Sequence, residues 1–100
     1  MMKDMQQETP RIVFQVYTYE LSEDPDGDTF ITKVKDTDRF IKLSGEDKAN
    51  ESKVAHILIE TGVLPKDQSC EYLVDNQNAD AIYVDKDGKP FCELRKIVIQ

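Results

Sequence analysis

The sequence predicts an α+β domain in which a single mixed β-sheet of about five strands packs against one α-helix, residues 46–61. Segments of alternating, β-branched and aromatic residues lie on both sides of one amphipathic helical segment, which is the pattern of a sheet with a packed helix. Of the 100 residues, 39% are hydrophobic, which is enough for one small core and too many for a disordered chain. We expect residues 1–10 to be a disordered N-terminal tail and residues 11–100 to form the domain.

The first half of the predicted sheet is a β-hairpin. Residues 11–21 are dense in β-branched and aromatic side chains, so they predict a strand. Residues 22–28 contain Asp-Pro and Asp-Gly and predict a turn, after which residues 29–35 alternate again as the partner strand. Residues 36–38 interrupt the alternation. Residues 39–43 are therefore either a further short strand or a continuation of the partner strand past a β-bulge.

The predicted helix has recognisable ends. Ser44 is a good N-cap, and Asp47 three residues later completes an approximate capping box. Gly62 is expected to end the helix, and Pro65 forbids its continuation.

A helical arc of apolar residues predicts the core. At 100° per residue, Val54, Ile57 and Leu58 share one face, which we expect to pack against Phe14, Val16 and Val98 of the sheet.

The second half of the chain supplies the remaining strands. Residues 70–75 fit either a short strand or one to two helical turns, because both periodicities match. Residues 81–84 predict a short strand, residues 85–90 a tight turn, and residues 91–99 a final strand.

The passage from Val54 to Leu64, which ends in Gly62-Val63-Leu64-Pro65, resembles the helix-to-turn passage of ubiquitin-like domains. The resemblance implies a β-grasp-like arrangement in which the first and last strands pair in the middle of the sheet. The sequence closes on Ile97-Val98-Ile99-Gln100 rather than on a Gly-Gly tail, so we do not expect a role in conjugation.

No motif for metal, phosphate or nucleophilic chemistry emerges from the residue spacing. The Asp-rich turns lack the Gly and Glu of a calcium-binding EF-hand loop, and Cys70, Cys92 and His56 lack the paired spacing of zinc ligands. We expect both cysteines to be reduced, partly buried thiols. His56 falls on the polar face of the helix with Glu60 four residues later. We therefore expect no cofactor, no metal and no catalytic residue.

Charge narrows the classes of partner. Thirteen basic residues oppose twenty acidic ones, for a net charge of −7, which disfavours binding to nucleic acid or to an anionic membrane. No apolar run is long enough to span a bilayer, and residues 1–10 lack the apolar stretch of a secretory signal. We expect a cytoplasmic protein.

An acidic cluster at the predicted hairpin turn is the candidate site. Five acids occur within nine residues and no base lies among them: Glu20, Glu23, Asp24, Asp26 and Asp28. They fit either a solvated turn or an anionic patch that docks on a basic protein surface.

The function that this sequence favours is a small non-enzymatic protein-binding module, such as an inhibitor or immunity-type protein. One alternative is a structural or assembly subunit that acts through a sheet edge or a homodimer interface. Another is a small enzyme that works through Cys70 or Cys92.

Overall fold

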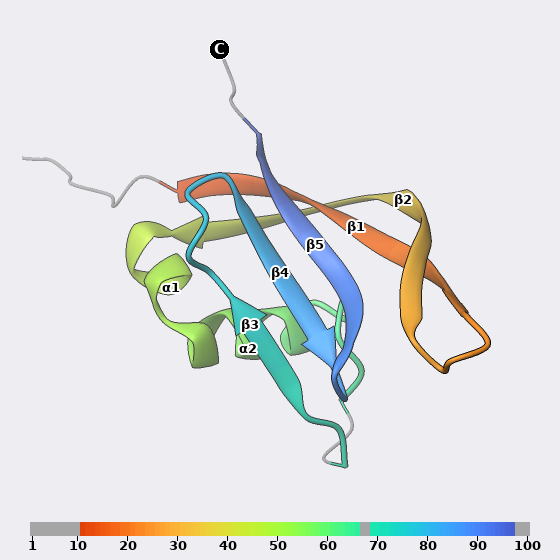
Figure 1. The fold of residues 1–100 in the computed structure, drawn as a ribbon. Coiled ribbons are helices and arrows are strands. Elements are labelled where there is room, and N and C mark those ends of the chain that lie inside the picture. The colour runs from red at the N-terminus through yellow and green to blue at the C-terminus, as the bar shows by residue number, and fades with distance from the viewer. Residues whose placement is uncertain (1–10, 67–68, 98–100) are drawn as a thin grey trace, which may run out of the picture.

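One five-stranded antiparallel sheet with two short helices on one of its faces forms the fold (Figure 1). The structure is a computed structural model that describes residues 11–66 and 69–97. The strand order is β2-β1-β5-β4-β3. In chain order the elements are β1 (Arg11–Glu23), β2 (Thr29–Ser44), α1 (Gly45–Ala49), α2 (Glu51–Glu60), β3 (Tyr72–Asp75), β4 (Ala81–Lys86) and β5 (Lys89–Ile97).

The strands confirm a single sheet with the first and last strands adjacent, but the sheet is not mixed. Every neighbouring pair, including β1 with β5, is antiparallel. The two helices return the chain across the sheet, so β3 runs in the same direction as β2 at the opposite edge. The meander β3-β4-β5 then brings β5 antiparallel to β1. A β-grasp-like arrangement is not confirmed.

The hairpin of β1 and β2 is longer than the sequence predicts, and β2 is continuous. Residues 29–44 form one strand, so the continuation past a bulge is the correct alternative. The register with β1 shifts between Val16 and Tyr17, where residues 37 and 38 are extra on β2. Asp38 takes a positive φ of 59° there, and Thr37 donates its hydroxyl to the carbonyl of Val16 over 2.7 Å. Side chains thus replace the ladder bonds that the bulge removes.

The predicted single helix is two helices separated by Asn50. Ser44 and Asp47 form both bonds of the capping box that starts α1. Asn50 has extended backbone angles, and its side chain accepts a hydrogen bond from the Lys53 amide, so it ends α1 and caps α2. Apolar periodicity alone gave one helix because Asn50 lies on the polar side of that pattern, where a cap residue breaks no apolar contact.

The core lies between α2 and the face of the sheet that α2 covers. Val54 and Leu58 are fully buried against Phe14 and Val16, and Ile57 packs at the side of this cluster. These contacts confirm the predicted orientation of the helix, while Val98 lies outside the described residues. Leu43, Ile82, Val84, Cys92 and Leu94 complete the buried face of the sheet.

The second half of the chain forms strands at each predicted position. Residues 72–75 are a strand and not helical turns. The turn between β4 and β5 consists of Asp87 and Gly88, both with positive φ, as in the two-residue hairpin turns that match strand twist. The expected tail, residues 1–10, lies outside the described residues.

Candidate functional site

The outer part of the β1–β2 hairpin projects beyond the sheet as a two-stranded ribbon. β1 pairs with β5 only from Val13 to Thr18, whereas its pairing with β2 continues to Glu23. Residues 20–34 therefore form a ribbon that no helix and no other strand of the described chain covers, and we call this ribbon the arm (Figure 1).

The five predicted acidic residues all lie on the arm, but they do not play equal parts. Asp24 holds the turn together, because its carboxylate accepts the amides of Asp26 and Asp28 at 3.0 and 2.9 Å. Glu20 pairs with Lys35 across the ribbon at 3.1 Å.

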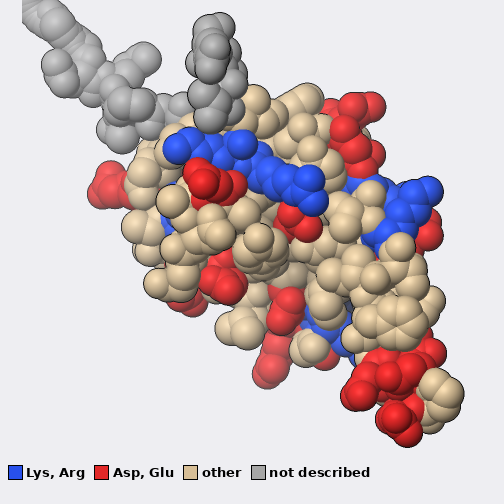
Figure 2. Space-filling view, turned by 45° about the horizontal axis from the view of Figure 1, so that its top comes forward, with Lys and Arg blue, Asp and Glu red and all other residues tan. Residues whose placement is uncertain are grey.

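Three of the five carboxylates point into solvent at or beside the turn: Glu23, Asp26 and Asp28. Figure 2 shows this end of the molecule as a dense group of acidic side chains. The sequence therefore located the acidic group correctly, and the structure limits its unpaired members to these three.

Exposed apolar side chains share the arm with these acids. Of the seven large hydrophobic residues exposed in the described part of the chain, four lie on the arm: Leu21, Phe30, Ile31 and Val34, between 37% and 48% exposed. Sequence reasoning missed this surface because the alternation of residues 29–35 predicts a strand but not which of its faces is covered. Ile31 pairs with Leu21 and Val34 with Tyr19, so Leu21, Ile31 and Val34 share one face of the arm, whereas Phe30 lies on the other face. Apolar exposure clustered on one face marks interaction surfaces in proteins.

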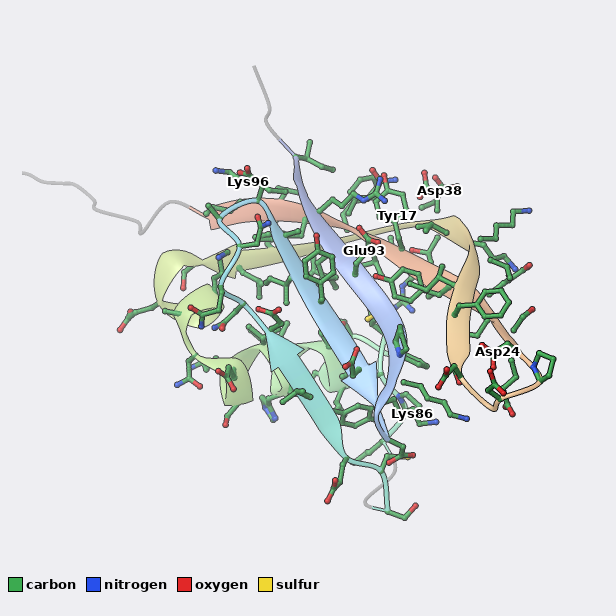
Figure 3. All side chains as sticks on the ribbon, viewed as in Figure 1. Tyr17, Asp24, Asp38, Lys86, Glu93 and Lys96 are labelled. Atoms are coloured by element: carbon green, nitrogen blue, oxygen red, sulfur yellow. The ribbon has the colours of Figure 1, made fainter. Side chains whose placement is uncertain are left out.

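A polar network fixes the base of the arm on the uncovered face of the sheet. Glu93 of β5 is only 8% exposed, and it accepts the Tyr19 hydroxyl at 2.9 Å and the Arg95 guanidinium at 2.6 Å. Arg95 also lies over the Tyr17 ring, 4.3 Å from its centroid. Burial, together with the bond to Glu93, raises the pKa of Tyr19 above its usual range. In Figure 3 Glu93 and Tyr17 lie side by side on neighbouring strands.

This network joins β1 to β5 near the last ladder pair, Thr18 with Cys92. Because both acceptor oxygens of Glu93 are engaged, a buried charge is satisfied here and the direction in which the arm leaves the sheet is constrained. Nothing in the sequence marks Glu93, since one of its two partners, Tyr19, comes from a distant position of the chain.

A groove lies between the arm and the β4–β5 turn. It has a volume of about 390 Å³ and is lined by Leu21, Lys86, Asp87, Lys89, Pro90 and Phe91. Figure 3 labels Lys86 near the β4–β5 turn and Asp24 at the tip of the arm.

The thiols and the histidine lie in different surroundings. Cys70 and Cys92 do not form a disulfide. Cys92 is fully buried, and burial raises its pKa to about 12, which makes it a poor nucleophile. His56 lies on the exposed side of α2 and contacts Glu60, as expected.

Across 11–66 and 69–97, no group of three or more His, Cys, Asp or Glu side chains is arranged to hold a metal ion. Neither helix in these ranges has the length and apolar character that crossing a bilayer requires.

Comparisons with protein-family models, with curated proteins and with solved structures find no match to this chain.

Proposed function

We propose that this protein is a cytoplasmic, non-enzymatic protein-binding module that docks through its arm on a basic surface of a partner protein, as inhibitors and immunity-type proteins do. The observation that carries the proposal is the combination on the arm of four exposed apolar side chains with three solvent-facing carboxylates.

The two kinds of side chain contribute differently to such an interface. Carboxylates at the turn raise the association rate with a basic partner, while each exposed ion pair adds only about 0 to 1 kcal/mol of affinity. The apolar side chains supply affinity through burial, at roughly 25 cal/mol per Å² of apolar area removed from water. The arm carries both, so it can attract a partner and then hold it.

Hydrogen bonds at the base of the arm hold it in place before a partner binds, which lowers the conformational entropy that binding costs. The network around Glu93 connects β1 to β5, and the bulge at residues 37–38 is satisfied by its own side chains. A pre-organised element loses less conformational freedom on binding than a mobile loop does.

The test separates the effect of the turn carboxylates on the association rate from the effect of the net charge of the protein. The partner is first captured from native lysate with the wild-type chain and identified by mass spectrometry. Association rates are then measured at low and physiological salt for the wild type and for Asp26→Asn/Asp28→Asn, which leaves the structural carboxylate of Asp24 in place. The matched control is Glu51→Gln/Glu71→Gln, which removes two exposed charges outside the arm.

We expect the turn variant to associate several-fold more slowly than the control at low salt, and the difference to shrink as salt screens the charges. Equal rates for the two variants at low salt would show that the turn is only solvated and that the partner binds elsewhere.

A further inference from the structure

The two helices cover one face of the sheet, and the opposite, uncovered face is largely apolar (Figure 1). Phe14 and Val16 of β1 point toward the helices, so the odd-numbered residues of β1 point to the uncovered face, and so do their ladder partners. This face carries six of the seven large hydrophobic residues exposed in the described part of the chain: Leu21, Ile31, Val34, Phe40, Leu73 and Tyr83. Apolar exposure on this scale marks an interaction surface.

The uncovered face also has opposite charges at its two ends. Lys42 and Arg95 lie near the start of β1, because their ladder partners there are Val13 and Gln15. Among the described residues no carboxylate forms an ion pair with Lys42, and Arg95 uses only its Nε, which bonds to Glu93. The three solvent-facing carboxylates of the arm lie at the other end, at or beside the turn. The occupant that fits the cationic end is therefore apolar and carries carboxylates.

The arm of a second copy has that composition, since one of its faces is apolar and its tip is acidic. We propose that two copies of the protein dimerise face to face, each laying its arm across the uncovered face of the other's sheet. In β1, residues 13–17 precede Thr18 within the sheet and residues 19–23 follow it. A two-fold axis at the level of Thr18 therefore exchanges two halves of equal length, and each contact forms twice.

This axis matches unlike charges and places apolar side chains together. The ladder pair of Leu21 and Ile31 in one copy faces the row that holds Phe40 and Arg95 in the other, and Glu23 faces Lys42. An arm about 20 Å long and about 10 Å wide, laid on each of the two faces, buries about 800 Å² in total. That area lies at the lower end for specific interfaces, which favours a weak and reversible dimer.

Dimerisation goes beyond the proposed docking on a partner protein. Both interactions use the apolar face of the arm, so a docked partner would displace the second copy. The dimer does not depend on Asp26 or Asp28, whose charges test the docking. Its own test needs only the purified chain, so a monomeric result would leave the docking proposal standing, and a failed docking test would leave the dimer standing.

The experiment is sedimentation velocity of the purified chain between about 1 µM and about 1 mM. The wild type should shift with concentration from one to two times its mass of 11.5 kDa. Ile31→Ser should weaken the dimer by about tenfold or more, because Ile31 lies on the apolar face of the arm. Phe30→Ser is the matched control and should dimerise like the wild type, because Phe30 is equally exposed but lies on the opposite face of the same arm.

A charge exchange tests the two-fold arrangement independently of the apolar contacts. Lys42→Glu should weaken the dimer, whereas Lys53→Glu, which changes the net charge equally but lies on the exposed side of α2, should weaken it much less. Glu23→Lys alone should also weaken it, although it reduces the net negative charge. The double variant Glu23→Lys/Lys42→Glu, whose net charge equals that of the wild type, should restore the dimer.

Three results would overturn the proposal. The first is a wild type that stays monomeric over the whole concentration range. The second is a dimer that Phe30→Ser weakens as much as Ile31→Ser does, because the interface would then not be the uncovered face. The third is a double charge variant as weak as the single ones, because Glu23 and Lys42 would then not face each other.

Discussion

At the scale of single residues, Leu58 is fully buried in the core, and Glu93 is the centre of the polar network on the uncovered face of the sheet. Leu58 and Val54 belong to a helical arc that can be read directly from the sequence. Glu93 is one acid among twenty in the chain, and although Arg95 lies two residues later on the same strand, only the sheet brings Tyr19 to its other oxygen. Among the acids of the arm, the carboxylate of Asp24 also closes the turn, a role that the charge cluster in the sequence does not reveal.

Leu58 gives the most direct residue-level test of the core. It is fully buried against the sheet, so Leu58→Ala should lower the free energy of unfolding by about 2 to 5 kcal/mol. Leu73→Ala removes the same atoms from a side chain that is 65% exposed and should change stability by no more than about 0.5 kcal/mol. Urea denaturation of both variants checks the pair, and an unchanged midpoint for Leu58→Ala would contradict the orientation of α2.

The buried thiol of Cys92 makes the free energy of unfolding depend on pH in the alkaline range. Burial raises its pKa to about 12 in the folded protein, while an unfolded thiol titrates near 8.5. The unfolded chain therefore loses this proton first, and the folded state becomes less favourable as pH rises above about 8.5. Between pH 7 and pH 10 the loss should be about 2 kcal/mol.

Urea denaturation at the two pH values measures this loss. Cys92→Ala, although less stable overall, should show a pH dependence smaller by that amount. Equal pH dependence in the wild type and Cys92→Ala would mean that the thiol titrates normally and is not buried as described.

At the scale of elements, local sequence patterns predict where α2 ends and that a hairpin forms, but they do not predict contacts with distant strands. Gly62 was predicted to end the helix, and it does so with a φ of 83° while Val63 donates to the carbonyl of Leu58 at 2.9 Å. Arg39 from β2 donates to the carbonyls of Thr61 and Gly62, a contact no local pattern reveals. Likewise, alternation predicted the hairpin, but the length of the arm depends on where β5 leaves β1.

Gly62→Ala tests this helix end. An alanine must take the left-handed conformation there, which should cost about 1 to 2 kcal/mol. Gly45→Ala is the control, since Gly45 starts α1 with open space around it and should be neutral or stabilising by about 0.4 to 1 kcal/mol. Thermal unfolding followed by circular dichroism gives both values. A Gly62→Ala variant as stable as Gly45→Ala would show that α2 does not end in this geometry.

At the scale of the whole molecule, the α+β class, the single sheet and the adjacency of β1 and β5 followed from the sequence, but strand direction did not. The alternation of side chains between the two faces has the same period in parallel and antiparallel strands. The sequence pattern therefore does not distinguish a mixed sheet from an antiparallel one. Only part of the candidate site can be predicted from the sequence. Its acidic turn is a local feature of residues 20–28, whereas its exposed apolar side chains and the groove beside Lys86 and Lys89 exist only once the sheet has formed.

The projecting arm underlies the proposed docking on a partner, and residue-resolved amide hydrogen exchange tests its exposed β1 edge most directly. The measurement is made at a dilution where the protein sediments as a monomer. Amides of residues 20 and 22, which face β2, should exchange slowly, and those of residues 21 and 23 should exchange rapidly. Residues 13, 15, 17 and 19, which face β5 within the sheet, should be protected. Uniform protection of residues 20–23 in the monomer would contradict the open edge, because it would mean that β1 is paired on both sides along its whole length.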